Sequence, residues 1–312
     1  MMTNKPIPAE LFAPADRKDD ADKITRPTIG FWKDVLRRLL QNKLAMFGFF
    51  LIVVMLIMAF LGPQISGYSY FQQELTHMNI EPNGQYWFGT DTLGRDLFTR
   101  ICFGIRYSLL IGILAAAMDF VIGVSYGGIA GMASSKVDTL MMRIAEIAYA
   151  IPYMLIVILI SVTMGKDQGA SLYTLVLAMS ITGWVPMAIM VRGQVLQLRE
   201  NEYCLASQSL GGSKKHILTK HIIPNTLGPI LVNITLSVPR AIFAEATLSF
   251  MGLGLQPPQP SLGVLATDGL EVMGIGLFYQ MLLPALFISL IMFSFNVFGD
   301  GLQDALDPRL RK

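Results

Sequence analysis

Charged residues are scarce in this chain. Asp, Glu, Lys and Arg make up 15% of its 312 residues, whereas hydrophobic residues make up 53%. An average soluble domain is about 25% charged. The shortage of charge therefore excludes an ordinary soluble domain and indicates a protein that lies in lipid. With a formal net charge of only +2, the composition gives no reason to expect a nucleic-acid partner.

Residues that bind metals are few and scattered. The cysteines are Cys102 and Cys204, and the histidines are His77, His216 and His221. None of these spacings matches a structural metal site. We therefore expect no metal site and interpret both cysteines as packing residues.

The chain also lacks the phosphate-binding loop of ATPases. No G-x-x-x-x-G-K-[ST] segment, which would hold the phosphates of a nucleotide, occurs in the sequence. No apolar stretch contains the acid pair or the serine-histidine pairing of an intramembrane hydrolase. We therefore expect no enzymatic activity, no catalytic residue and no cofactor in this chain.

Long apolar stretches, in contrast, are abundant. A hydrocarbon core of about 30 Å requires roughly 20 helical residues, because a helix satisfies its own backbone hydrogen bonds. Six stretches have this length: Leu44–Leu61, Tyr107–Ile129, Ile144–Met164, Leu172–Val191, Leu227–Met251 and Gly276–Val297. They predict an all-α polytopic membrane protein with six transmembrane helices.

Lysine and arginine are distributed unevenly between the two sides that these spans define. With the N-terminus inside, the inner segments contain 19 basic residues and the outer loops contain three, which are Arg95, Arg100 and Lys166. Basic residues accumulate on the cytoplasmic side of membrane proteins. We therefore predict that both termini are cytoplasmic.

The spans divide the chain into five parts. These are a cytoplasmic N-terminal segment (1–43), a first transmembrane helix (44–62), an extracytoplasmic insertion (63–103), a core with five transmembrane helices (104–298) and a cytoplasmic tail (299–312). Within the core, the inner segment 192–226 is long and amphipathic, which predicts short helices rather than a simple loop.

The inner segment begins with a short apolar stripe. Tyr203, Ala206 and Leu210 have the spacing of one helix face. Gly211 and Gly212 follow, and glycine supplies the positive φ with which a helix ends. The pattern predicts a helix that ends in a sharp reversal at these glycines.

A second, basic helix is expected over Ser213–Ile222, ending at Pro224. A short helix held between two spans can dock on a partner protein and transmit its movement. It can equally lie flat on the membrane with its lysines on anionic headgroups. The residues alone leave both interpretations open.

Three ionisable residues lie inside predicted spans, namely Asp119, Arg240 and Glu245. Facing lipid costs such a group about 2.5–3.5 kcal/mol. Each is therefore expected either to line an aqueous pathway or to pair with a neighbouring helix. Arg240 and Glu245 are five residues apart and do not share a helix face well.

The outer segment before the second span contains Gly89 and Gly94 together with Asp91, Arg95 and Asp96. This composition predicts a tight, hydrogen-bonded turn. Asp96 lies near the helix start, where the exposed amide groups favour an acid. The turn is either a rigid lip that contacts an external partner or a cap on the helix.

The inner segment resembles the cytoplasmic coupling loop of permease subunits of binding-protein-dependent ABC importers. The pattern of that loop is Glu-Ala-Ala, three residues, Gly, nine residues and Ile-x-Leu-Pro. The residues at motif positions are Ala206, Gly211, Ile223 and Pro224. At Ile223 the motif has leucine. The departures are Leu205 for glutamate, Ser207 for alanine and His221 for isoleucine. Glu202 is the candidate to replace the missing acid.

This resemblance implies that the inner segment couples the chain to an ATPase. The residues it implicates are Glu202, Tyr203, Leu205, Ala206, Ser207, Leu210, Gly211, Ile223 and Pro224.

Two further stretches narrow the resemblance to one subfamily. Residues 87–116, WFGTDTLGRDLFTRICFGIRYSLLIGILAA, and residues 296–312, NVFGDGLQDALDPRLRK, are similar to the C-type permease of oligopeptide, dipeptide and nickel importers. The resemblance implies a type I ABC importer permease core in a bacterial cell membrane. It also implies a heterodimer with a second permease, two ATP-binding subunits that hold ATP and Mg, and an extracytoplasmic substrate-binding protein. In this interpretation Asp91, Arg95 and Asp96 are the candidates for contact with the binding protein.

The leading hypothesis is therefore uptake of oligopeptides or dipeptides. Import of nickel or another small solute is the alternative within the subfamily. An ion-driven secondary transporter could use Asp119 as a proton relay, but six spans without a matching second half argue against it. A requirement for co-expressed ATPase subunits would distinguish an ABC importer from the secondary transporter.

Overall fold

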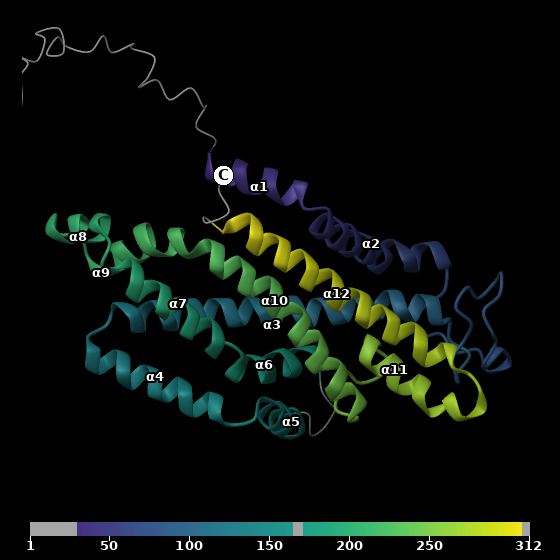
Figure 1. Ribbon diagram of the computed structural model, residues 1–312. Helices are drawn as coiled ribbons and strands as arrows, with labels where there is room; N and C mark the ends of the chain where they lie inside the picture. Colours follow the sequence, from purple (N-terminus) through teal and green to yellow (C-terminus); the bar gives the residue numbers. More distant parts are fainter. Residues whose placement is uncertain (1–29, 165–170, 308–312) are drawn as a thin grey trace, which may run out of the picture.

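The computed structural model describes residues 30–164 and 171–307. Lys166, residues 1–29 of the predicted N-terminal segment and residues 308–312 of the predicted tail lie outside the described residues. Within the described ranges the regular structure is helical and contains no strand (Figure 1). The α-helices are α1 (Phe31–Gln41), α2 (Lys43–Ser66), α3 (Leu97–Met132), α4 (Ser135–Ala150), α5 (Tyr153–Met164), α6 (Leu172–Gly183), α7 (Val185–Leu198), α8 (Glu202–Ser209), α9 (Lys214–Ile217), α10 (Ile223–Phe250), α11 (Leu262–Glu271) and α12 (Tyr279–Leu306).

Four helices are long and apolar enough to cross a membrane: α2, α3, α12 and the continuous helix Lys214–Phe250, which includes α9 and α10. Two pairs, α4 with α5 and α6 with α7, reach the required length only together. The described residues therefore provide four candidate spans, or up to six if each bent pair crosses once. Each predicted span overlaps one of these helices or pairs, and the number of crossings stays a prediction.

The predicted span Ile144–Met164 is not one unbroken helix, because the helix breaks at Pro152. α4 and α5 are bent by 77° relative to each other. Proline has no N–H to donate, and it forces the preceding residue out of the helical region. Ile151 is accordingly extended, with φ −77° and ψ 129°.

The predicted helix end at Pro224 is also wrong. The helix passes through a π-helical turn, Leu218–Ile222, and continues into α10 with Pro224 in the first turn. A proline is tolerated there because the first N–H groups of a helix need no partner within that helix. The amide group of Asn225 also donates to the carbonyl oxygen of His221 (2.5 Å).

Two boundaries also differ from the predicted insertion 63–103. α2 extends to Ser66 and ends at Gly67, which has a left-handed φ of 73°. α3 begins at Leu97, because the side chain of Asp96 caps it. The segment between the two helices is therefore 67–96, which is shorter than the predicted insertion.

α3 is the central helix of the bundle and packs against α2, α7 and α10. Its contact with α7 is close: a Cβ atom at Gly127 would overlap the backbone of Ala188. Small residues allow the two helices to approach closely. The resulting van der Waals contacts stabilise helix association in lipid, where the hydrophobic effect does not favour it. The 36 residues of α3 extend about 54 Å at the usual helical rise, so α3 reaches both ends of the bundle.

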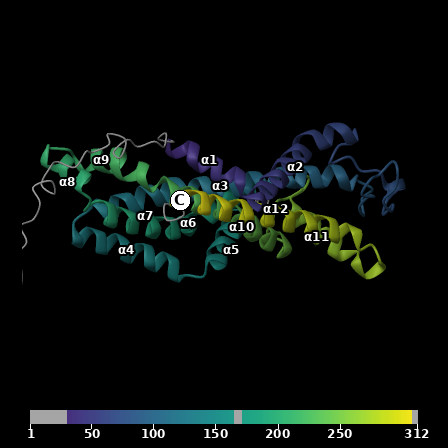
Figure 2. The same cartoon turned by 45° about the horizontal axis from the view of Figure 1, so that its top comes forward.

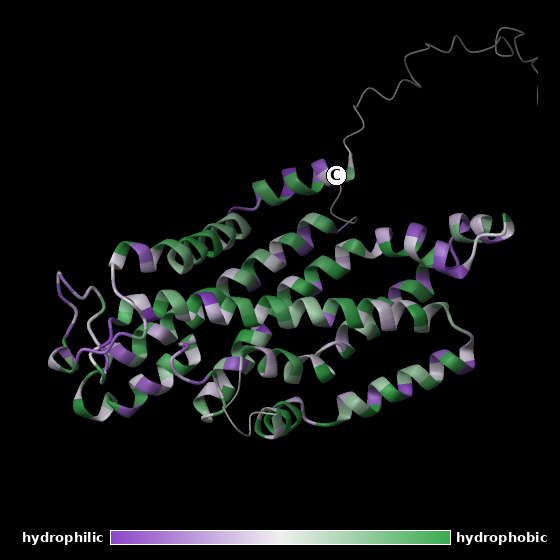
Figure 3. Ribbon diagram, turned by 180° about the vertical axis from the view of Figure 1, so that it is seen from behind, coloured by the Kyte–Doolittle hydropathy of each residue, from purple (hydrophilic) through white to green (hydrophobic). Residues whose placement is uncertain are grey.

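The molecule has two polar ends. α8 and α9 lie at one end, whereas segment 67–96 and α11 lie at the other (Figures 1 and 2). Hydrophobic residues predominate along the long helices between them, and hydrophilic residues gather in segment 67–96 and around α8 and α9 (Figure 3). This distribution is typical of a protein that spans a bilayer.

Hydrogen bonds hold segment 67–96 against the start of α12. The hydroxyl group of Tyr279 donates to the carbonyl oxygens of Ile80 (3.0 Å) and Thr90 (3.1 Å). The amide group of Gln280 donates to Asn79 Oδ1 (2.9 Å) and to the carbonyl oxygen of Thr90 (3.1 Å). The segment is therefore a folded part of the bundle rather than a free loop.

Candidate functional site

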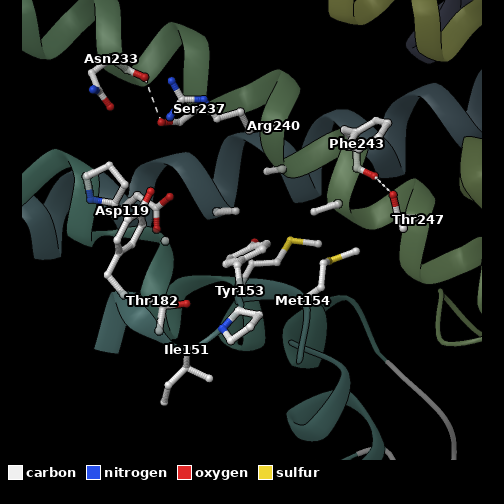
Figure 4. Close-up of a pocket in the computed structure, with 18 residues that line it drawn as sticks. Asp119, Ile151, Tyr153, Met154, Thr182, Asn233, Ser237, Arg240, Phe243 and Thr247 are labelled. Atoms are coloured by element: carbon white, nitrogen blue, oxygen red, sulfur yellow. Dashed lines mark hydrogen bonds between the residues drawn. The ribbon is translucent and has the colours of Figure 1, made fainter. Parts of the chain in front are cut away.

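A cavity of about 640 Å³ lies between α3, α10 and the two bent helix pairs (Figure 4). Both helix breaks contribute to its wall, through Ile151 and Pro152 of one pair and Gly183 of the other. Most of the lining is apolar or aromatic. The polar residues that line it are Asp119, Tyr149, Tyr153, Thr182, Asn233, Ser237, Arg240 and Thr247.

Asp119 and Arg240, which the sequence singled out, both line this cavity. Asp119 projects from α3 and Arg240 from α10, so opposite charges come from different helices. The guanidinium end of Arg240 runs toward Ser237, on the side of the cavity where Asp119 lies (Figure 4). Within the described part of the chain, no ion pair or hydrogen bond joins Arg240 to any residue, although its charge attracts that of Asp119.

Glu245, the third predicted residue, does not line the cavity and is fully buried. Its carboxyl group accepts hydrogen bonds from three serine hydroxyl groups. The donors are Ser261 (2.6 Å), Ser249 (2.7 Å) and Ser108 (3.2 Å). These serines lie on α3, on α10 and at the N-cap of α11, so Glu245 joins three elements of the bundle.

At the end formed by segment 67–96 and α11, Asp91 and Arg95 belong to a buried charge cluster. Asp91 Oδ1 accepts hydrogen bonds from the backbone N–H groups of Leu93 and Arg95 (both 2.9 Å), which forms the predicted tight turn. Asp91 Oδ2 pairs with Arg95 Nε at 2.6 Å and also with Arg100 Nη1. Arg100 reaches across to Asp268 of α11 at 3.3 Å. The exposed fraction of Asp91 is only 3%, which favours the structural interpretation of this turn.

Asp96 is the N-cap of α3. One of its carboxylate oxygens accepts hydrogen bonds from the backbone N–H of Thr99 (2.7 Å) and from its hydroxyl group (2.5 Å). Burial raises the pKa of Asp96 above its ordinary value, while the bonds from Thr99 act in the opposite direction. The side chain therefore supports the helix start, as its position in the sequence suggested.

At the opposite end of the bundle, α8 ends in the predicted reversal. Gly211 has a φ of 86°. Its N–H donates to the carbonyl oxygen of Gln208, and the N–H of Gly212 donates to that of Ser207, both at 2.9 Å. This pair of bonds is the Schellman motif, which requires a left-handed residue after the helix.

α8 presents most of its apolar side chains to the surroundings. Leu205 is 49% exposed and Leu210 is 89% exposed. Tyr203 and Ala206 are exposed too, whereas Cys204 points inward and packs against Ile217 and Ile222. The remaining residues implicated by the coupling motif are Glu202 and Ser207 in α8, and Ile223 and Pro224 in the first turn of α10.

The C-terminal part of the chain matches a known family model. The model, described as the binding-protein-dependent transport system inner membrane component, matches residues 123–312. The chain belongs to this family. A second model, the N-terminal TM domain of oligopeptide transport permease C, matches residues 30–82. Together the two models confirm the resemblance found in the sequence, including the C-type subfamily.

Relatives of this transport component are similar over nearly their full length. The dipeptide transport system permease protein DppC of Bacillus subtilis is 50% identical over 98% of this chain and 95% of that protein. The oligopeptide transport system permease protein OppC of the same organism is 48% identical over 98% and 99%. OppC of Haemophilus influenzae is 38% identical over 90% and 89%.

Among solved structures, inward-facing MetNI methionine ABC transporter is similar in fold. A chain of that structure superposes with a TM-score of 0.50 at 19% identity, covering 64% of this chain and 94% of that chain. At this identity the likeness concerns the fold alone. It supports the predicted all-α permease core.

Several residues of this transport component were missed by sequence reasoning. Arg100 could have been found, because it stands four residues after Asp96, which the sequence places near a helix start. Asp268 carries no local signal, since its partner is 168 residues away in the chain. Thr182 also carries no local signal, because it lines the cavity only where α6 ends at the break before α7.

Proposed function

We propose that this chain is a transmembrane subunit of an ATP-driven importer and forms, with a second homologous permease subunit, a pathway for the uptake of peptides. An extracytoplasmic binding protein delivers the oligopeptide or dipeptide. Two ATP-binding subunits hold ATP and Mg and supply the energy. Family membership and the names of the B. subtilis relatives support this proposal.

One observation of the structure carries the proposal: both helix breaks line the same cavity. Irregular backbone at membrane depth is costly in lipid and is tolerated where it borders protein or a water-filled space. A cavity bordered by two broken helices therefore suits a pathway that polar solutes enter. The second permease subunit closes the open side of the cavity in this proposal.

We place α8 on an ATP-binding subunit at the cytoplasmic face. Its exposed apolar side chains, Tyr203, Leu205 and Leu210, provide a surface for a groove. The Schellman turn at Gly211 holds α8 at a defined angle to the basic helix that continues into α10. A movement of the ATPase is then passed through one continuous helix, Lys214–Phe250, to the cavity wall.

The outer end faces the binding protein in this proposal. Asp91 and Arg95 are buried, so they act by keeping segment 67–96 in shape rather than by direct contact. Exposed aromatic residues on the same segment, such as Phe71 and Trp87, are available for contact.

The proposal is tested by uptake of a radiolabelled tripeptide into cells that lack their own peptide importers. Co-expression of this chain, the second permease, both ATP-binding subunits and the binding protein should give uptake that stops when ATP is depleted. Omission of the ATP-binding subunits should abolish uptake. Uptake that persists without them and follows a proton gradient would refute the proposal in favour of a secondary transporter.

The coupling role is tested at Gly211. Gly211→Pro cannot adopt a φ of 86°, since proline is held near −65°, and it also removes the N–H bond to Gln208. We expect uptake and stimulated ATP hydrolysis to be lost, while the protein still inserts into the membrane.

The matched control is Leu205→Glu on the exposed face of α8, which restores the acid of the motif and should retain uptake. Normal coupling in Gly211→Pro would show that α8 does not transmit the signal. Loss of complex assembly in Leu205→Glu would contradict the alignment with the motif.

A further inference from the structure

Two opposite charges line the cavity without direct partners. Oδ1 of Asp119 is buried and has no hydrogen-bond partner among the described residues. Arg240, within the same described ranges, forms neither a hydrogen bond nor an ion pair. An ionisable group in a span without a partner is costly, so these groups are suited to bind something that enters the cavity.

A neutral donor adds to this arrangement. In the described part of the chain, four buried side-chain nitrogen or oxygen atoms lack a partner, and two of them, Asp119 Oδ1 and Thr182 Oγ1, belong to residues that line this cavity. Thr182 is only 4% exposed. Buried polar groups in folded proteins normally have partners, so this concentration marks the cavity as a binding site.

Three other charged residues inside the described part of the bundle have hydrogen-bond partners. Arg106 donates to the carbonyl oxygen of Ala59 (2.7 Å), and Arg192 forms two bonds of 2.6 Å with Asp138. Glu245 accepts hydrogen bonds from three hydroxyl groups. Asp119 and Arg240 therefore differ from these charged residues in having no hydrogen bond or ion pair within the described residues.

The position of the negative charge is set by a glycine. A Cβ atom on Gly183 would lie 2.7 Å from Asp119 Oδ1 and 2.8 Å from Oδ2. Gly183 is the last residue of α6, at the break before α7. The carboxylate thus lies against the break itself, where only a residue without a side chain leaves it room.

The chemistry of the cavity fits an organic zwitterion. A carboxylate binds an ammonium group and a guanidinium group binds a carboxylate, in both cases through charge-assisted hydrogen bonds. A divalent cation fits less well, because Arg240 repels it and such ions require several oxygen ligands. The flexible or aromatic side chains of Met154, Met179 and Phe243 can accept varied side chains of a ligand. The volume of about 640 Å³ falls within the usual range for small-ligand pockets.

We propose that Asp119 and Arg240 form a two-point site for the charged ends of a peptide in the pathway, with Asp119 binding the α-ammonium group and Arg240 binding the α-carboxylate group. This inference rests on the proposed peptide import. It adds that the membrane subunit itself recognises the ends of the peptide after the binding protein has released it.

The experiment compares trialanine with trialanine amide, which lacks the carboxylate, in proteoliposomes containing the complete transporter. Peptide concentrations are chosen so that the binding protein is equally occupied by each peptide, and initial uptake is measured. The ratio of acid to amide uptake should fall about tenfold in Arg240→Gln relative to the wild type, as expected for loss of one charge-assisted bond. The wild-type and Arg240→Gln transporters use the same binding protein, so its preference between the two peptides cancels when their uptake ratios are compared.

A second arm tests the other end of the peptide. The ratio of trialanine uptake to N-acetyl-trialanine uptake should fall by a similar factor in Asp119→Asn. Arg240→Lys keeps the charge and should restore most of the acid preference. Stimulated ATP hydrolysis reports that each variant is assembled. The matched controls are Arg143→Gln and Asp304→Asn, which change exposed charges away from the cavity and should leave both ratios unchanged.

The outcomes separate the two proposals. Wild-type ratios in Arg240→Gln or Asp119→Asn would overturn the two-point site while leaving peptide import intact. Failure of Arg240→Gln to assemble with the second permease would also overturn it and would assign Arg240 to the subunit interface. Absence of any peptide uptake by the wild-type complex would instead refute the proposed function.

Discussion

The outer charge cluster and the cavity use the same kinds of side chain in opposite ways. In the cluster beside segment 67–96, Asp91 pairs with Arg95 and Arg100 and is almost fully buried. In the cavity, Asp119 and Arg240 lie on facing helices without a direct bond in the described part of the chain. Paired charges fix the conformation of a segment, whereas charges without partners remain available to a ligand. The comparison therefore separates charges that hold the fold from charges that are available to a ligand.

The first way to break this comparison is to remove a charge from the outer cluster. Asp91→Asn keeps the oxygen that accepts the N–H groups of Leu93 and Arg95, but it places an amide NH₂ group against two guanidinium groups. Leaving a buried charge without its partner costs about 3–5 kcal/mol. We expect a marked loss of folded protein and a large decrease in the thermal midpoint of the detergent-purified complex.

The control for this change is Asp268→Asn, at the exposed edge of the same cluster. Asp268 contacts Arg100 at 3.3 Å and is 41% exposed, so its loss should cost at most about 1 kcal/mol. Equal effects of the two substitutions would contradict the distinction between the buried and exposed parts of the cluster.

A second, intermediate effect is expected at Glu245. Glu245→Ala leaves the hydroxyl groups of Ser108, Ser249 and Ser261 without their shared acceptor and creates a small void. A buried polar group without a partner costs about 1–3 kcal/mol. The thermal midpoint should decrease by less than in Asp91→Asn, and Glu245→Gln, which keeps an acceptor oxygen, should recover part of the loss. A stability equal to that of the wild type in Glu245→Ala would show that the serine cluster does not hold α11.

The smallest effect on stability is expected in the cavity. Asp119→Asn removes a charge that has no direct partner, and such a charge is itself costly in a span, so the free energy of unfolding should not decrease. The measurement is again the thermal midpoint of the assembled complex without peptide. A decrease comparable to that of Asp91→Asn would mean that Asp119 holds the fold, and the contrast between the two regions would be lost.

The sequence predicted those features that depend on neighbouring residues. The left-handed turn at Gly211 and the capping position of Asp96 follow from local backbone chemistry, and both are confirmed. The family was also recognisable, because the motif around Gly211 and the stretches 87–116 and 296–312 are continuous in the chain.

The errors arose where the effect of a proline depends on its surroundings. Pro152 breaks a helix within a predicted span, whereas Pro224 lies inside a helix that continues past it. The difference is that Pro224 stands in the first turn after a π-helical segment, where its missing N–H is not needed. No pattern of apolar residues distinguishes these two situations.

The sequence by itself determined that the chain is helical, apolar and suited to a bilayer, and that one segment resembles the coupling loop of the family, because these properties depend on composition and on spacings of a few residues. Only the tertiary structure decided which charges have partners. Arg100 meets Asp268 and Ser108 meets Glu245 across 168 and 137 residues of chain, while Asp119 and Arg240 meet a cavity instead. The physical reason is that the partner of a buried charge is set by the packing of distant helices, and the two helix breaks that form the cavity are part of that packing.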